Sequence, residues 1–246
     1  MQEIFKCMFE IFKKYPNIIA AVSRKEDGTM KLSGASMGDE EIIENRERFL
    51  GKLGIEDGLT VKAGLVHGNN VNVISNEEAG KVIKKTDGLI TADKNLFLTI
   101  TVADCLPIFI YDSEKEIIGL VHSGWRSLAQ NILIQAIKKM AGNLGSLPKD
   151  ILVGIGPGIS QCHFEVKEDL LVEFKPYLGD ALLNKNGKLF LDLKKIAKIQ
   201  LINLGVREKN IEISQECTFC LPDKYFSFRR DRPKTPQTMT AVIGRK

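Results

Sequence analysis

Two apolar runs on either side of a short polar segment form the clearest pattern in the chain. Residues 106–111 and 117–121 are rich in β-branched and aromatic side chains, and the polar residues 112–115 separate them. Runs of this composition are typical of buried strands, so we predict a β-hairpin. A two-residue turn at the centre of the polar segment would set Cys105 opposite His122, on the same face and with Cβ atoms roughly 5 Å apart.

Strands and helices alternate along the rest of the chain. Helices are expected over residues 1–15, from about Arg126 to Met140, and over 167–174 and 193–204. A further helix is expected from Ser36 or Asp39 to about Leu53, and its buried stripe would be Ile42, Ile43, Phe49, Leu50 and Leu53. Short apolar runs predict strands over residues 18–24, 59–66, 86–91, 96–103, 151–155, 211–214 and 238–243. No Pro/Gly/Ser-rich linker or charge block divides the chain, so we expect one domain over residues 1–246 with the fold of a mixed α-β sandwich.

Composition and charge exclude several classes of function. The chain is 43% hydrophobic and 27% charged, with a net charge of +4 and no basic stripe interleaved with aromatic residues, so nucleic acid is not an expected partner. No apolar stretch is long enough to span a bilayer, and charges interrupt the N-terminal segment throughout. Five cysteines without a small disulfide framework suit a reducing cytoplasm. We expect a cytoplasmic monomer or homodimer.

The chain holds only three histidines, His67, His122 and His163. His67 follows the apolar run 59–66 and precedes a Gly-Asn-Asn turn signal, so it is expected at a strand end, as are Cys105 and His122. One cysteine and two histidines with a fourth position free for water is the arrangement of a catalytic zinc site. Spacing alone leaves two interpretations, a shared metal ion or ordinary core residues.

Several motifs occur in the order and at the intervals of one known family. They are LVHG (residues 65–68), TDGLIT (86–91), ADCLPIFIYD (103–112), VHSGWRS (121–127), GIGPGIS (154–160) with FEV (164–166), and CTFC (217–220) followed by YFSFRRD (225–231). In these motifs, from about Val22 to Ile243, the chain resembles the YfiH family. That family is also known as the multicopper polyphenol oxidase or laccase family, and its members are understood as purine nucleoside phosphorylases.

The resemblance implies a set of metal ligands and an activity. It implies that His67, Cys105 and His122 bind zinc, with copper as an adventitious or alternative metal. The implied reaction is phosphorolysis of adenosine, inosine and 5′-methylthioadenosine with phosphate, with some deamination of adenosine. The expected partners are therefore purine nucleosides and phosphate, without nucleic acid or membrane.

Candidate substrate residues come partly from the resemblance and partly from local pattern. Asn45-Arg46 matches an Asn-Arg pair of the family, which implies that Arg46 contacts substrate; a solvated helix arginine is the plain alternative. The helix expected near Arg126 begins close to His122, so its backbone N–H groups, Ser123 and the Arg126 guanidinium would form an anion site.

Two further pairs of charged residues lie near the motifs. Arg229 and Arg230 are candidates to bind phosphate, although they could equally form a solvated pair. Asp87 and Asp104 are candidates to orient ligands or to move protons.

Three other enzymatic functions compete with phosphorolysis. A laccase needs several coppers, and three histidines cannot ligate them; a single copper at Cys105 would lack a nearby axial methionine. A nucleobase deaminase needs H-x-E and P-C-x-x-C, which the chain matches only in part with His163-Phe-Glu165 and the CTFC run at 217–220. A cysteine hydrolase could use Cys105 as nucleophile and His122 as base. A scaffold that only binds a partner is the non-enzymatic alternative.

Overall fold

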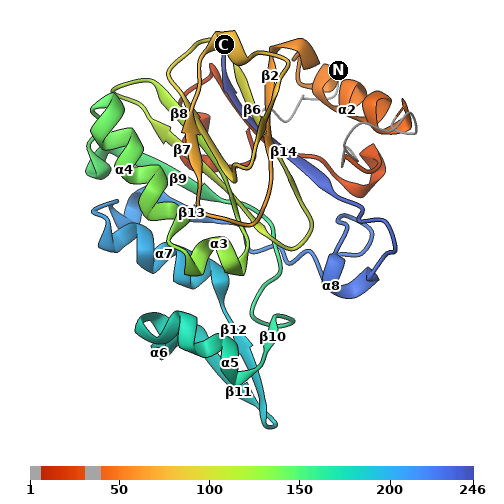
Figure 1. The fold of residues 1–246 in the computed structure, drawn as a ribbon, viewed down its shortest axis with the longest axis vertical. Helices are drawn as coiled ribbons and strands as arrows, with labels where there is room; N and C mark the ends of the chain where they lie inside the picture. Colours follow the sequence, from red (N-terminus) through yellow and green to blue (C-terminus); the bar gives the residue numbers. More distant parts are fainter. Residues whose placement is uncertain (1–6, 31–39) are drawn as a thin grey trace.

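Two β-sheets packed face to face form the centre of the protein (Figure 1). The computed structural model describes residues 7–30 and 40–246. The first sheet has the strand order β1 (Ile18–Val22), β14 (Met239–Arg245), β6 (Phe97–Val102), β2 (Thr60–Gly64) and β4 (Val82–Lys84). The second has the order β13 (Ile211–Ile213), β9 (Ile151–Ile155), β7 (Leu106–Asp112), β8 (Ile117–Ser123), β5 (Gly88–Thr91) and β3 (Val71–Val73).

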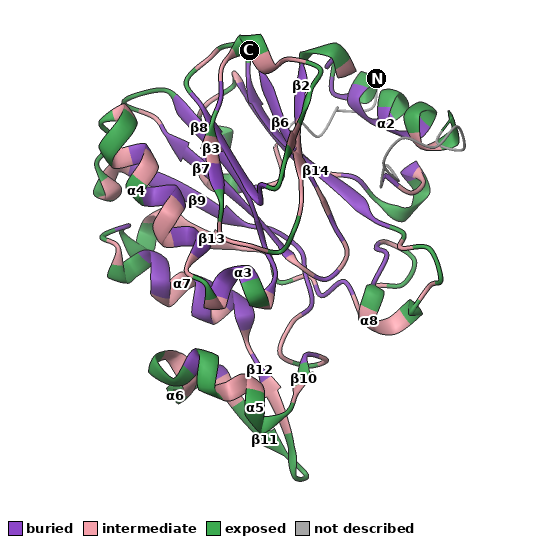
Figure 2. Ribbon diagram, viewed as in Figure 1, coloured by how far each residue is buried: buried purple, intermediate pink, exposed green. Residues whose placement is uncertain are grey.

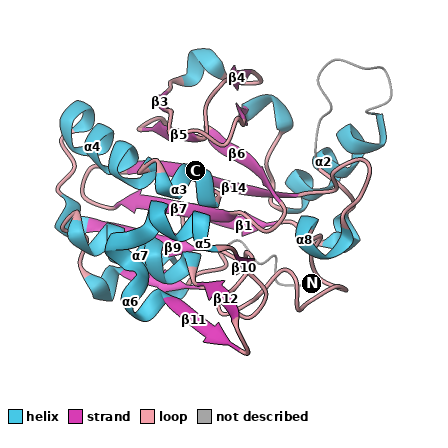
Figure 3. Cartoon of the chain, turned by 60° about the horizontal axis from the view of Figure 1, so that its bottom comes forward, coloured by secondary structure: helices cyan, strands magenta, loops and turns pink. Residues whose placement is uncertain are grey.

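Helices cover the outer face of each sheet. Those on the second sheet are α3 (Trp125–Ala129), α4 (Ile132–Leu144) and α7 (Leu193–Asn203), which Figure 3 shows together along one side. On the first sheet, α2 (Glu40–Lys52) packs against a separate apolar cluster. The result is the predicted mixed α-β sandwich, and no helix in the described ranges is long and apolar enough to cross a membrane.

Strand β7 lies between two apolar layers, which explains its unbroken apolar run. Phe109 and Tyr111 pack into the cluster between the sheets, whereas Ile108 and Ile110 pack into the cluster beneath the helices. Every residue of β7 and β8 is buried, as the purple strands of Figure 2 show. Alternate side chains of a strand point to opposite faces, so a strand covered on both sides needs apolar residues at every position.

The predicted hairpin exists, but its turn is longer than predicted. Asp112 pairs with Ile117, so the turn has four residues instead of two. The Asp112 carboxylate accepts hydrogen bonds from the backbone N–H groups of Glu114 and Lys115, at 2.9 and 3.1 Å, and Glu116 adopts φ 55°. A side chain that bonds the backbone of its own turn favours this wider loop.

The longer turn shifts the register by two residues, so the predicted pairing of Cys105 with His122 was wrong. His122 pairs with Pro107, and Cys105 lies just before the strand. Because side chains alternate with a period of two, a shift of two residues leaves Cys105 and His122 on the same face. The prediction that they lie together therefore survives the error in register.

Two predicted helices differ from those observed. Of the predicted N-terminal helix, residues 1–6 lie outside the described residues, and only α1 (Glu10–Lys13) is helical beyond them. Cys7 instead forms a β-bridge with Ala20. The helix expected from Arg126 is two helices, α3 and α4, because Asn131 adopts a left-handed φ of 61° between them.

The predicted buried stripe of helix α2 is confirmed only in part, because the helix also buries the polar residues Asn45 and Arg46 while Ile42 is half-buried. Phe49, Leu50 and Leu53 are buried as predicted, but Ile43 is 45% exposed. Arg46 is buried on the inward side of the helix. The proposed caps at Ser36 and Asp39 lie outside the described residues.

A third, smaller sheet lies at the lower end of Figure 1. It contains β10 (Glu165–Val166), β12 (Lys188–Leu191) and β11 (Leu182–Lys185), and α5 (Glu168–Leu171) and α6 (Leu178–Ala181) lie beside it. The helix predicted over 167–174 is a single α-turn followed by 3-10 turns, and this sheet was not predicted. The helix predicted over 193–204 is confirmed as α7.

Candidate active site

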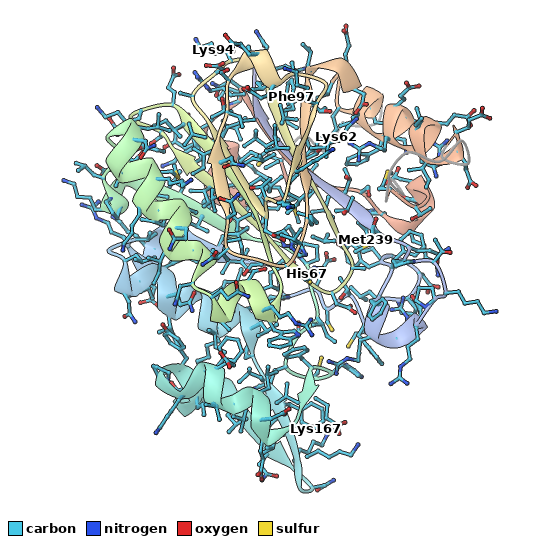
Figure 4. The ribbon with its side chains drawn as sticks, viewed as in Figure 1. Lys62, His67, Lys94, Phe97, Lys167 and Met239 are labelled. Carbon is cyan, nitrogen blue, oxygen red and sulfur yellow. The ribbon has the colours of Figure 1, made fainter. Side chains whose placement is uncertain are left out.

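Three side chains that the sequence analysis singled out meet where the two sheets come together. His67 follows β2, Cys105 lies between β6 and β7, and His122 stands in β8. One ligand atom from each lies within 4.8 Å of the others. Figure 4 labels His67 at the lower end of the sheets. The fold thus brings together one thiol and two imidazoles from three separate segments, a set that could hold a metal ion.

Asp87, directly before β5, fixes both histidines. Its buried carboxylate accepts hydrogen bonds from the backbone N–H groups of Val66, His67 and Gly68, at 3.1, 2.9 and 2.9 Å. These bonds hold His67 at φ 57°, a conformation that costs a non-glycine residue of order 1 kcal/mol. Asp87 Oδ1 also lies 3.0 Å from His122 Nδ1. The other ring nitrogen, Nε2, is therefore left for Cys105 or a metal.

Cys105 and His122 perturb each other strongly. Burial raises the pKa of the Cys105 thiol, but the charge of His122 and hydrogen bonds from both histidines outweigh burial and lower that pKa to about 6. Burial lowers the pKa of His122, but the Cys105 charge and the bond to Asp87 raise it to about 9. Between these two values the metal-free pair is a thiolate and an imidazolium, and the thiolate is the form that binds metal.

Position 124, beside the cluster, has no room for a side chain. A Cβ atom at this position would lie 2.8 Å from Cys105 Sγ and 3.5 Å from His67 Cδ2. The contact with Cys105 Sγ is too close for any larger residue to fit without moving the thiol, whereas the distance to His67 is an ordinary van der Waals contact. Gly124 also precedes α3, so the chain passes tightly around the sulfur before the helix begins.

The cluster lies on the wall of a cavity of about 460 Å³. This volume is in the usual range for sites that bind small organic ligands. The rest of the wall includes the aromatic residues Trp125, Phe164 and Phe228 and the arginines Arg126 and Arg229. The Arg126 guanidinium lies 4.3 Å from the Trp125 ring centre, and that of Arg229 lies 5.1 Å from the Phe164 ring centre. The cavity therefore combines flat apolar surfaces with positive charge.

Asp104 connects the cluster to the arginine side of the cavity. Its carboxylate accepts hydrogen bonds from the Arg229 backbone N–H and the Thr218 hydroxyl, both at 2.7 Å. Asp104 itself adopts φ 81° directly before Cys105. The predicted orienting residue therefore joins α8 (Phe228–Asp231) to the chain segment that carries the thiol.

Arg46 lies apart from this cavity among the described residues. Its Nη1 donates to Thr240 Oγ1 at 3.3 Å, and its Nη2 lies 3.6 Å from Asp57 Oδ1. Burial lowers the pKa of the Arg46 guanidinium, and the Asp57 charge opposes this effect. A substrate contact of Arg46 stays a prediction.

Ser123 and Arg230 also lie outside the cavity lining, as far as the chain is described. Ser123 is fully buried in β8. The Arg230 guanidinium donates to the carbonyl oxygens of Thr218, Phe219 and Tyr225, at 2.8 to 2.9 Å. Their roles toward substrate likewise remain predictions.

The sequence analysis missed two aromatic residues of the wall. Phe164 and Phe228 both stand inside motifs that were noted, next to His163 and Arg229 respectively. An aromatic residue beside a candidate ligand or cation was the available signal. It was too weak to separate a cavity wall from ordinary packing.

Fold and cluster together define a class of α-β sandwich proteins with a cysteine–histidine site at the ends of its strands. Residues 20–246 match the family described as multi-copper polyphenol oxidoreductase laccase, and the chain belongs to that family.

Named relatives and solved structures agree with this assignment. The chain is 32% identical over 219 residues to the purine nucleoside phosphorylase YlmD of Bacillus subtilis, covering 85% of this chain and 78% of the relative. The crystal structure of YlmD from Geobacillus stearothermophilus matches with a TM-score of 0.90 and 28% identity, covering 98% of this chain and 95% of that one. The Bacillus licheniformis protein YfiH matches with a TM-score of 0.89 and 28% identity, covering 95% of both chains.

Proposed function

We propose that this chain is a zinc-dependent purine nucleoside phosphorylase that acts on adenosine, inosine and 5′-methylthioadenosine. The names of its relatives support phosphorolysis of purine nucleosides. The observation that carries the proposal is the cavity itself. A cysteine–histidine cluster, three aromatic residues and two arginines line one space of ligand size.

The donor set fits zinc. One thiolate and two imidazoles leave a fourth position for water or substrate, as in catalytic zinc sites. The carboxylate of Asp87 on His122 is the partner that such ligands require to fix their ring orientation. Copper accepts the same ligands at a single site, but the chain has only three histidines in total, too few for several coppers. Zinc bound here would supply a Lewis acid.

Phosphorolysis breaks the bond between a purine nitrogen and the sugar C1 atom, and a phosphate oxygen then bonds to C1. The electron pair of the broken bond stays with the purine, which also takes up a proton. The sugar passes through a cation-like state, so the attacking phosphate must be held close and correctly oriented. We assign this task to Arg126 and Arg229, whose guanidinium groups line the cavity and suit bidentate bonds to phosphate.

The purine is assigned to the aromatic part of the wall. Trp125, Phe164 and Phe228 offer flat apolar faces, which suit stacking against a planar base. Phe228 is 54% exposed, so a bound purine would cover an apolar surface that otherwise faces water.

The test combines metal analysis with product analysis. Full-length protein is incubated with inosine, with and without phosphate, and hypoxanthine and ribose 1-phosphate are measured by chromatography. We expect both products only with phosphate, loss of activity on chelation, and recovery with zinc. His122→Ala should lose the activity. Hypoxanthine formed at an equal rate without phosphate would refute phosphorolysis, and activity unaffected by chelation would refute the metal requirement. Release of ammonia from adenosine tests the predicted deamination.

A second candidate is a cysteine hydrolase, which one specific contact favours. Asp87 orients His122, and His122 in turn holds the Cys105 thiol at low pKa. A thiol, an imidazole and a carboxylate in this order are the parts of a cysteine nucleophile with its base. The two candidates differ in how Cys105 responds to metal removal.

A further inference from the structure

A second cluster of metal-binding side chains lies outside the active site. Cys162 and His163 stand in the loop between β9 and β10, and Cys217 and Cys220 stand in the turn between β13 and α8. One ligand atom from each lies within 4.8 Å of the others. Residues more than fifty positions apart in the chain thus meet in one group.

The spacing of these atoms matches a tetrahedral ion. The Cys162 sulfur lies 3.7 Å from that of Cys217 and 3.6 Å from that of Cys220. His163 Nδ1 lies 3.2 Å from the sulfurs of Cys162 and Cys220. Ligands of tetrahedral zinc lie about 3.8 Å apart for two sulfurs and about 3.5 Å for sulfur and nitrogen. A disulfide requires about 2.05 Å, so the three thiols are separate.

The donor types select the metal. Three thiols and one imidazole are soft and borderline donors, which favour zinc over magnesium or calcium. Four protein ligands also fill a tetrahedral shell completely, which is the arrangement of structural zinc sites. The partial deaminase motif, His163 to Glu165 with the two cysteines of CTFC, lacks an open position for water once Cys162 is included. Glu165 is exposed and pairs with Lys188 at 3.0 Å.

Charged and polar groups around the cluster suit a bound ion. Three thiolates and one dication leave a single negative charge. Lys194 is buried, with 5% of the residue exposed. Its ammonium group donates to the carbonyl oxygens of Ser214 and Glu216, both at 2.8 Å, and Glu216 directly precedes Cys217. The backbone N–H of Ser160 points at the Cys217 sulfur at 3.4 Å. Cys217 is the buried thiol of the cluster, and the positive charge of Lys194 interacts with it, so Lys194 offsets part of the negative charge there.

We propose that Cys162, His163, Cys217 and Cys220 bind a structural zinc ion that fixes one wall of the active-site cavity. Phe164, a wall residue, directly follows His163. Thr218, which bonds Asp104, directly follows Cys217. An ion at the cluster therefore ties together the two segments that place Phe164 and Asp104. The proposal stands independently of the reaction proposed above.

Metal content of the full-length protein is the direct test. We expect about two zinc ions per chain in the wild type and about one in Cys220→Ser. Cys7→Ser, which removes a thiol outside both clusters, should keep two. His163→Cys should also keep two, because four thiolates bind zinc equally well, whereas His163→Ala should weaken the second ion. A wild-type chain that holds no more zinc than Cys220→Ser after refolding with excess zinc would refute the proposal, whatever the active-site cluster binds.

Cobalt exchange identifies which ligands hold each ion. A three-thiolate site gives thiolate-to-cobalt absorption about three times that of the single thiolate at Cys105, because the band scales with the number of sulfurs. We expect this strong band to persist in His122→Ala and to disappear in Cys220→Ser.

A measurement on the wild type alone covers the case in which the variants do not fold. A thiol reagent should first reach the exposed Cys162 and Cys220, and release of one zinc ion should then leave the buried Cys217 open to the same reagent. Labelling of the three thiols without zinc release, or a disulfide among them in freshly purified protein, would overturn the assignment.

Discussion

The reactivity of Cys105 toward an alkylating reagent separates the two candidate functions. With zinc bound, the Cys105 sulfur is a coordinated thiolate, and iodoacetamide should modify it slowly. Removal of the ion leaves a thiolate beside the His122 imidazolium on the cavity wall, within reach of the reagent. We therefore expect a chelator to accelerate labelling at Cys105 and added zinc to protect it again.

The pH dependence of the Cys105 labelling rate distinguishes this thiol more sharply than its rate at a single pH. At pH 7 a thiol of pKa about 6 is about 90% thiolate, against about 3% for an ordinary cysteine of pKa about 8.5. The lower basicity reduces the intrinsic nucleophilicity by about 10- to 20-fold, which cancels most of that advantage. Between pH 8 and pH 6, however, the Cys105 rate should fall only about twofold, whereas the ordinary thiol should fall roughly 75-fold.

Peptide mapping by mass spectrometry can follow Cys105 separately from the four other cysteines. Cys7 is the internal control, because burial raises the pKa of its thiol and its labelling should fall steeply below pH 8. A Cys105 profile as steep as that of Cys7 would refute the electrostatic argument. Rapid labelling of Cys105 in zinc-loaded protein, matched by loss of activity that chelation does not affect, would support the cysteine hydrolase instead.

Two further substitutions test the residues around the cluster. Arg126→Ala should raise the KM for phosphate by about 10- to 100-fold and the KM for nucleoside much less, with Arg126→Lys in between; equal increases would remove Arg126 from the phosphate site. Asp87→Asn should lower zinc affinity about 10- to 100-fold, because it removes the carboxylate partner of His122. Burial alone would raise the pKa of Asp87, but its hydrogen bonds and the His122 charge outweigh burial and lower this pKa below its usual value. The carboxylate therefore stabilises the fold above about pH 4, and this stability is lost as the pH falls further. Unfolding in denaturant across this range should therefore show weaker acid destabilisation in Asp87→Asn, and an unchanged pH dependence would contradict this role.

Local pattern predicted that Cys105 and His122 lie together and that His67, like them, stands at a strand end, whereas the metal itself was implied by the family resemblance. The apolar runs of β7 and β8 mark those ends in the sequence, and an error of two residues in register left both ligands on one face. An error of one residue would have separated Cys105 from His122. The strand order was not predictable in the same way, since β6 and β7 are neighbours in the chain but belong to different sheets.

Other features depend on contacts between distant segments. Helical periodicity near the N-terminus did not show that Cys7 forms a β-bridge with Ala20 of β1. Nor did it show that the Phe9 ring centre lies 5.2 Å from that of Phe109 between the sheets. Tertiary contacts of this kind override local helical preference. The buried side of α2 was predicted correctly at Phe49 and Leu50 but not at Ile43, and the burial of Arg46 was missed. An arginine that pairs with Asp57 cannot be distinguished from a solvated one by periodicity.

The second cluster shows most clearly what a motif leaves undetermined. His163, Glu165 and the two cysteines of CTFC suggested a deaminase in part, and the fold does bring His163 and both cysteines together. A motif names ligand types, but whether a zinc site is catalytic depends on how many protein ligands surround the ion. Cys162, adjacent to His163 and outside the motif, supplies the fourth ligand and closes the shell. With one coordination position open, His163, Cys217 and Cys220 would hold an ion that could activate water. With Cys162 as the fourth ligand, the ion instead holds two segments of the cavity wall in place.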